Sequence, residues 1–129
     1  MNTNAVCWFE IYVDDMPRAK AFYESVLNQE LTRLDKPDEQ KDFLQPEMWA
    51  FPMEERPGAS GAICKMEGVA AGGNSTLVYF DSEDCSVEEA RVEKAGGKLV
   101  VPKMAIGEYG FISIGQDTEG NTIGFHSMQ

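Results

Sequence analysis

Two stretches of this chain follow the same order, and the second begins sixty-nine residues after the first. In the first, a strand-like run at Val6–Val13 leads into Asp14-Asp15 and then into a helix-like run from about Pro17 to Leu27. In the second, Thr76–Asp81 leads into Glu83-Asp84 and another helix-like run. Three short strand-like runs follow each helix, so each half has the order β-α-β-β-β. Such a repeat predicts two copies of one supersecondary unit packed together.

The first half shows the expected periodicities. In Val6–Val13, alternation places Cys7, Phe9, Ile11 and Val13 on one face and Trp8, Glu10 and Tyr12 on the other. Asp14-Asp15 offers an N-cap before Pro17. Apolar residues then recur at helical spacing, which predicts a helix that packs an aromatic face on the sheet: Ala19, Phe22, Tyr23 and Val26.

Three further strands are expected in this half, at Glu30–Leu34, Leu44–Met53 and Ala59–Met66. The second of these contains Pro46 and Pro52, which suits an edge strand because proline cannot donate to a ladder. The charged segment Asp35–Asp42 is expected to be a loop, and Glu54–Gly58 a turn.

In the second half, Ser86 with Glu89 matches a capping box, and Gly96-Gly97 would end the helix. Strands are predicted at Lys98–Val101, Tyr109–Ile114 and Thr122–His126. The last two flank Gly120-Asn121, a pair typical of a tight turn, and so form a closing hairpin. We therefore expect modules at residues 1–68 and 73–129, joined by a linker at 69–72, within one structural domain.

Composition excludes several classes of protein. With 129 residues and 43% hydrophobic content, the chain suits one globular core. Its net charge of -11, without a Lys/Arg cluster, disfavours nucleic acid, and either attracts cationic ligands or simply keeps the protein soluble. The uncharged run Gly68–Phe80 is Gly-rich and too short for a membrane helix.

The cysteines and the beginning of the chain point to a compartment. Cys7, Cys64 and Cys85 are odd in number and not spaced as a zinc or redox pair, so we expect reduced thiols packed like small hydrophobes. The first residues lack a basic segment, which argues against a secretory signal. Both features favour a cytoplasmic protein.

The tandem arrangement resembles the vicinal oxygen chelate superfamily, which contains glyoxalase I, the bleomycin-resistance proteins and the extradiol dioxygenases. The likeness is carried by the first strand with Asp14-Asp15-Met-Pro-Arg-Ala-Lys-Ala-Phe-Tyr23, by Ala95-Gly-Gly-Lys98 and by Asp117-Thr-Glu-Gly-Asn-Thr-Ile123. The resemblance implies an α+β fold in which two curved mixed sheets enclose a cavity. It also implies a homodimer.

Metal-dependent members of that superfamily take histidine and glutamate ligands from fixed strand positions. Aligned on Asp14 and Glu83, those positions fall on Trp8, Leu77 and Gly124, with the fourth near Ile63–Lys65. The side chains of Trp8, Leu77 and Gly124 cannot bind a metal ion, and the region around Ile63–Lys65 has no carboxylate or imidazole. We therefore expect no metal cofactor, although a divalent metal at shifted positions stays an alternative.

The side chains that would line the cavity share the faces of Trp8 and Gly124. The ligand-binding candidates are Trp8, Tyr12, Leu77, Tyr79, Asp81, Tyr109 and Gly124, and the catalytic candidates are His126 and Glu10. Such an aromatic and acidic pocket suits a planar or cationic molecule. Alternatively, Trp8 and Tyr79 fill a core, and His126, the single histidine, is a solvated strand-end residue.

Three classes of function follow from these residues. The first is a metal-free protein that binds a small organic molecule. The second is a glyoxalase-I-like lyase or isomerase, in which Glu10 and His126 rebuild a metal site. The third is a structural or regulatory protein whose cavity is filled by its own aromatic side chains.

Overall fold

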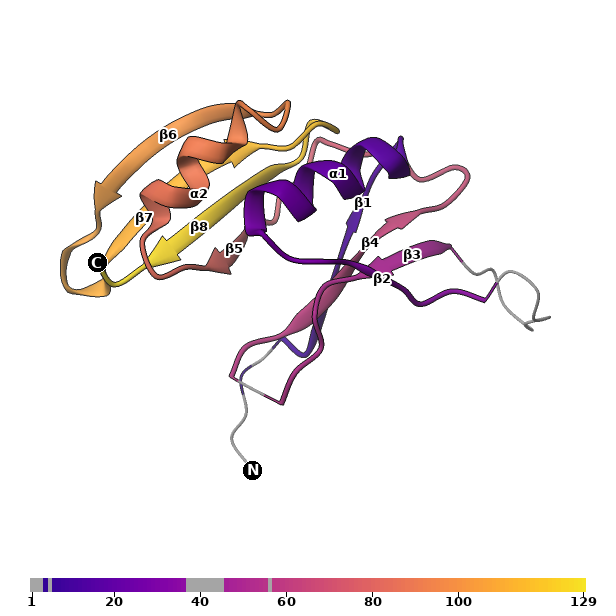
Figure 1. Ribbon diagram of the computed structural model, residues 1–129, viewed down its shortest axis with the longest axis horizontal. Helices are drawn as coiled ribbons and strands as arrows, with labels where there is room; N and C mark the ends of the chain where they lie inside the picture. The colour runs from indigo at the N-terminus through magenta and orange to yellow at the C-terminus, as the bar shows by residue number, and fades with distance from the viewer. Residues whose placement is uncertain (1–3, 5, 37–45, 56) are drawn as a thin grey trace.

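The computed structural model describes residues 4, 6–36, 46–55 and 57–129. Within these ranges, the first half begins with strand β1 (Trp8–Tyr12) and helix α1 (Met16–Leu27). The strands β2 (Thr32–Arg33), β3 (Glu47–Ala50) and β4 (Ser60–Lys65) follow. They form one sheet in the order β1-β4-β3-β2, in which β1 runs parallel to β4 (Figure 1).

The second half repeats this arrangement. Its elements, in chain order, are β5 (Val78–Asp81), α2 (Cys85–Val92), β6 (Lys98–Ala105), the short 3₁₀ turn η1 (Gly107–Tyr109), β7 (Phe111–Gln116) and β8 (Thr122–Ser127). The sheet order is β5-β8-β7-β6, with β5 parallel to β8. The predicted α+β fold of two tandem modules is confirmed. Among the described residues, no ladder joins the two sheets into a closed barrel.

The helix caps mark the repeat most closely. Asp15 caps α1 and accepts a hydrogen bond from the Arg18 amide (3.1 Å), and Asp84 caps α2 and accepts from the Ser86 amide (3.0 Å). The predicted capping box is wrong because α2 begins at Cys85, so Ser86 already lies inside the helix. Glu89 instead accepts a hydrogen bond from the Lys103 amide of β6.

One hydrophobic core serves both modules. Helix α1 contributes Met16, Ala19, Phe22, Tyr23 and Val26, all of which are buried. They meet residues of β1, β4, α2 and β8, including Ile11, Ile63, Val92, Ile123 and Phe125. The rings of Phe9 and Phe80, one from each module, lie 6.0 Å apart in this core. The opposite face of each sheet, which we call its open face, therefore points away from the helices.

The strand at Leu44–Met53 differs most from its prediction. Strand β3 covers four residues and lies between β4 and β2, so it is not an edge strand. Pro46 and Pro52 fall outside it, and every residue of β3 keeps an amide for the ladder. Most of the charged segment Asp35–Asp42, and residues 44 and 45, lie outside the described residues.

The closing hairpin is confirmed. Strands β7 and β8 pair in register from Gln116 opposite Thr122 to Phe111 opposite Ser127, and Gly120 takes a positive φ of 84° in the turn. Strand β6 runs four residues further than predicted, to Ala105. It tolerates Pro102 because it is an edge strand whose register shifts between Val101 and Met104.

The cysteines fall into two groups. Cys64 and Cys85 are free and buried, as expected, but Cys7 is exposed, so the prediction that all three pack like hydrophobes is wrong for Cys7. Cys7 precedes the first paired residue of β1, where the sheet no longer covers it. None of the described helices has the length and apolar character to cross a membrane.

Candidate functional site

The open face of β1 carries a carboxylate held between two aromatic residues. Glu10 accepts hydrogen bonds from the Trp8 indole N–H (3.2 Å) and from the Tyr12 hydroxyl (2.8 Å). The hydrogen bond to Glu10, burial and the negative charge of Glu10 raise the pKa of Tyr12 to about 12. Among the described residues, no cation pairs with Glu10, which is exposed. This trio is therefore an open anionic site with aromatic flanks.

Behind the trio lies a small apolar floor. Ala50, Ala62 and Cys64 are buried there, and Trp8, Tyr12, Leu34 and Met48 pack against them. Burial, followed by the charge of Glu10, raises the pKa of the Cys64 thiol to about 12. Cys64 is thus a packing residue and not a nucleophile, because the thiolate is the reactive form.

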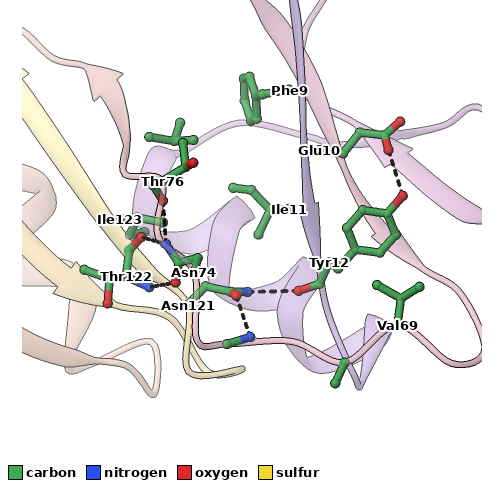
Figure 2. Close-up of a pocket in the computed structure, with 13 residues that line it drawn as sticks. Phe9, Glu10, Ile11, Tyr12, Val69, Asn74, Thr76, Asn121, Thr122 and Ile123 are labelled. Atoms are coloured by element: carbon green, nitrogen blue, oxygen red, sulfur yellow. Dashed lines mark hydrogen bonds between the residues drawn. The ribbon is translucent and has the colours of Figure 1, made fainter.

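A pocket of about 390 Å³ lies between β1 and the start of the second module (Figure 2). From β1 it is lined by Phe9, Glu10, Ile11 and Tyr12, and from the rest of the chain by Val69, Ala70, Gly72, Asn74, Thr76, Val78, Asn121, Thr122 and Ile123. Such a volume is typical of sites for small organic molecules. Glu10 and Tyr12 thus belong both to the open face and to this pocket.

Two asparagines shape the pocket wall. Asn121 donates to the Tyr12 carbonyl (3.0 Å) and accepts from the Gly72 amide (2.8 Å). Asn74 donates to the Thr122 carbonyl and accepts from the Thr122 amide, both at 3.2 Å. Asn74 and Asn121 were not identified from the sequence as residues that line a pocket. The Gly-Asn pair was identified only as a turn signal, and the contact of Asn121 with β1 joins residues far apart in the sequence.

The second module carries the other predicted residues on its own open face. The Tyr79 ring covers Gly124 so closely that a Cβ atom on Gly124 would lie 2.5 Å from it. Asp81 lies opposite His126 in the β5–β8 ladder. His126 Nε2 lies 2.6 Å from the Tyr109 carbonyl, and because a carbonyl only accepts, Nε2–H is the donor in this contact.

The predicted site residues thus form two sets, one on each sheet. Trp8, Glu10 and Tyr12 lie on the first open face. Tyr79, Asp81, Tyr109, Gly124 and His126 lie at the second, and Leu77 directly precedes β5. No hydrogen bond or ion pair between described residues joins the two sets. Their role in ligand binding and the catalytic role of Glu10 and His126 remain predictions.

The residues at the superfamily's ligand positions do not fit a metal ion. Glu10 lies opposite Ala62 in the first sheet, as Tyr79 lies opposite Gly124 in the second. Because the offset of sixty-nine residues relates Glu10 to Tyr79, Ala62 in the first module corresponds to Gly124 in the second, directly beside the predicted region around Ile63–Lys65. Trp8, Leu77, Ala62 and Gly124 offer no metal ligand, and the described residues contain no cluster of three or more His, Cys, Asp or Glu that could hold an ion.

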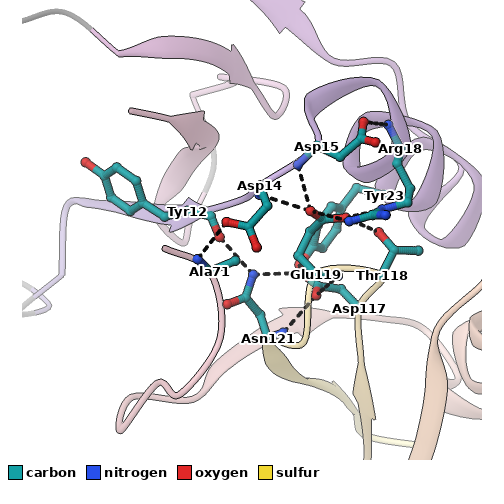
Figure 3. Close-up of polar contacts among 10 residues, drawn as sticks. All are labelled: Tyr12, Asp14, Asp15, Arg18, Tyr23, Ala71, Asp117, Thr118, Glu119 and Asn121. Atoms are coloured by element: carbon teal, nitrogen blue, oxygen red, sulfur yellow. Dashed lines mark hydrogen bonds and ion pairs between the residues drawn. The ribbon is translucent and has the colours of Figure 1, made fainter. Parts of the chain in front are cut away.

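A buried carboxylate fixes the closing turn to the start of α1 (Figure 3). Glu119 accepts hydrogen bonds from the amides of Asp14 (2.9 Å) and Asp15 (2.8 Å), and from Arg18 Nε (2.7 Å) and Nη2 (3.0 Å). Burial raises the pKa of Glu119, but Arg18 and the hydrogen-bond donors around the carboxylate outweigh burial and lower it to about 2. This contact holds the end of β1 against the loop before β8, which positions the pocket.

A buried hydrogen bond reinforces the same junction. The Tyr23 hydroxyl of α1 donates to Asp117 Oδ2 (2.6 Å), and burial, followed by the charge of Asp117, raises the pKa of Tyr23. Asp117 also accepts from the amides of Glu119 and Asn121 and from the Asn121 side chain. These hydrogen bonds attach the turn that bears Asn121 to α1 through Tyr23 and to β1 through Tyr12.

Comparison with known proteins identifies the same architecture. A family model described as the Glyoxalase/Bleomycin resistance protein/Dioxygenase superfamily matches residues 5–125. No curated protein gives a significant match to the sequence.

Solved structures share the fold at low sequence identity. A glyoxalase-related enzyme from Fulvimarina pelagi has a TM-score of 0.68 and 18% identity, over 97% of this chain and 88% of that chain. The antibiotic binding protein TnmS3 from Streptomyces sp. CB03234 has a TM-score of 0.66 and 21% identity, over 98% of both chains. A mutant of the fosfomycin resistance protein FosX from Listeria monocytogenes, complexed with Mn(II) and a dihydroxypropylphosphonic acid, has a TM-score of 0.66 and 14% identity, over 100% of this chain and 95% of that chain.

Proposed function

Because the chain belongs to the glyoxalase/bleomycin resistance protein/dioxygenase superfamily, we propose that it binds a small organic molecule without the metal centre of its metal-dependent relatives. The ligand-position residues Trp8, Leu77, Ala62 and Gly124 support a metal-free site, since none of these side chains can coordinate a metal ion. The pocket of about 390 Å³ beside β1 supplies the volume. The likeness to TnmS3, an antibiotic binding protein with the same fold, supports the proposal of small-molecule binding.

The ligand is a planar or cationic organic molecule. The single observation that carries this is the Glu10 carboxylate, which is flanked by Trp8 and Tyr12 and has no cation beside it among the described residues. A positive ligand would gain both the charge interaction and contact with the aromatic faces. The net charge of -11 would raise its local concentration.

This function is tested by titrating the protein with N-methylquinolinium and with neutral quinoline in a calorimeter. The cation should bind about three- to fivefold more tightly, a difference of ~0.6–1 kcal/mol that a favourable charge interaction supplies at an exposed site. Glu10→Gln should abolish the preference. Glu47→Gln is the matched control, because Glu47 also accepts from an indole N–H, that of Trp49 (3.1 Å), but lies on β3. Equal binding of both compounds would refute the charge argument.

We propose that the protein is a homodimer. The open faces of the two sheets carry the two sets of predicted site residues, and Tyr79 and Met104 are exposed on the second module at 44% and 47%. Pairing the first module of one copy with the second module of another would cover these faces and bring Glu10 and His126 toward one cavity. Light scattering after gel filtration should give twice the mass of 14.3 kDa.

The second candidate is a glyoxalase-I-like lyase or isomerase with a rearranged divalent-metal site. The observation that favours it is the place of the His126 imidazole on the second open face, where Nε2 donates to the Tyr109 carbonyl and Nδ1 has no hydrogen-bond partner among the described residues. Such an enzyme would lose turnover of a glyoxalase substrate with a chelator and with His126→Ala. Turnover that survives both treatments, or no turnover with any added metal, would exclude it.

We also propose a cytoplasmic location. Its support is that Cys7, Cys64 and Cys85 are all free thiols, and two of them are buried where oxidation would disrupt packing. Localisation of a fluorescent fusion tests this.

A further inference from the structure

The backbone of β1 is unpaired on its outer side. Strand β1 pairs with β4, and no other described strand pairs with it. In a parallel ladder, each residue directs its N–H and C=O to one side, and the next residue directs them to the other. The Val13 amide donates to the Cys64 carbonyl on the β4 side (2.9 Å), so Ile11 and Phe9 also face β4. Glu10 and Tyr12 therefore direct their backbone groups outward.

An amide already occupies the first position along this edge. The outward carbonyl of Tyr12 accepts from the side-chain amide of Asn121, as it would from a neighbouring strand (Figure 2). The Tyr12 N–H and both backbone groups of Glu10 have no partner among the described residues. These three groups border the pocket of about 390 Å³. The pocket therefore offers a donor, an acceptor and a second donor at the spacing of an extended chain.

The walls of the pocket differ on its two sides. On the core side lie Ile11, Val78 and Ile123, which are apolar. On the open-face side lie Glu10 and Tyr12, with the exposed Val69. Successive side chains of an added strand would point to these two sides in turn. The core side of the pocket suits an apolar side chain, and the Glu10 carboxylate on the open-face side suits a basic side chain.

From these contacts, we propose that the outer edge of β1 binds a short extended peptide in which an apolar residue is next to a lysine or arginine. The peptide adds to the sheet through its backbone, and its basic side chain pairs with Glu10. This inference names the ligand class of the site proposed above and rests on that proposed function.

The test compares three peptides by calorimetry: acetyl-leucyl-lysyl amide, its analogue with both backbone nitrogens N-methylated, and acetyl-leucyl-glutamyl amide. We expect N-methylation to weaken binding about tenfold, because it removes backbone donors. The acidic peptide should also bind at least about tenfold more weakly. Glu10→Gln should reduce the preference for lysine, and Glu47→Gln should leave it unchanged.

Amide hydrogen exchange, followed by nuclear magnetic resonance, provides a readout at the strand itself. Saturating peptide should slow exchange of the Glu10 and Tyr12 amides. The Ile11 amide, which already faces β4, is the internal control and should change little.

Four results would overturn the inference. Equal affinity of the N-methylated peptide, or unchanged exchange at Glu10 and Tyr12 under saturation, would rule out strand addition while leaving a cation site at Glu10. Binding of N-methylquinolinium without binding of any peptide would refute the inference that β1 binds a peptide, and would leave the proposed function standing. Failure of all of these compounds to bind would refute both.

Discussion

Replacing Glu119 with glutamine should lower the free energy of unfolding by about 3 kcal/mol at pH 7. The Glu119 side chain is fully buried and pairs with Arg18 at 2.7 Å. Burial raises the pKa of Glu119, but Arg18 and the neighbouring amides lower it from 4.5 to about 2. At about 1.4 kcal/mol per pKa unit, this difference gives the stated loss. A glutamine would also turn an N–H₂ group toward the Arg18 donors, which cannot accept from it.

The pH dependence gives a second check on the same variant. Because the pKa of Glu119 is lower in the folded protein, its contribution is complete above pH 4.5 and is lost as the pH falls toward 2. Urea unfolding of wild type and Glu119→Gln should therefore differ by less than half as much at about pH 3 as at pH 7. Glu30→Gln, at an exposed position, is the control and should change stability by less than ~0.5 kcal/mol. A difference below about 0.5 kcal/mol at pH 7, or one that is the same at both pH values, would refute the reasoning.

Three further predictions concern the open faces and the thiols. Gly124→Ala should destabilise the protein by about 1–3 kcal/mol in urea unfolding, because the added Cβ meets the Tyr79 ring at 2.5 Å; unchanged stability would mean that the ring moves freely. Glu10→Gln should bring the pKa of Tyr12 down from about 12 toward 10 in an ultraviolet titration, since the hydrogen bond and charge of Glu10 raise it; an unchanged pKa would assign the effect to burial. A disulfide reagent should react with one thiol per native chain, that of exposed Cys7, and with Cys64 only after unfolding; rapid reaction at Cys64 would contradict its raised pKa.

The sequence predicted the fold because the features that determine it are local. The N-cap at Asp14-Asp15 and the Gly-Asn turn are visible within a few residues, and the structure has an N-cap at Asp15 and the turn at Gly120. The prediction that β3 is an edge strand was wrong because Pro46 and Pro52 lie outside β3. A proline prevents pairing only when it lies inside the strand. The capping box failed because Asp84 occupies the cap two residues earlier.

The candidate site could be predicted only in part. Alternation along β1 and β8 correctly placed Glu10, Tyr12 and His126 on the faces opposite the core. The pocket wall was missed because the contact between Asn121 and Tyr12 joins residues that are 109 positions apart in the sequence. Contacts of this kind depend on how the two modules pack, and single-sequence periodicity does not contain that information.

The central claim is that this member of the superfamily binds its ligand without a metal ion. Untagged protein should be incubated with nickel, zinc and manganese, desalted, and measured by elemental analysis. The account predicts no retained metal and unchanged affinity for N-methylquinolinium in the presence of a chelator. Retention of about one ion per chain, lost in Glu10→Gln or His126→Ala, would contradict the account and support the metal-dependent lyase.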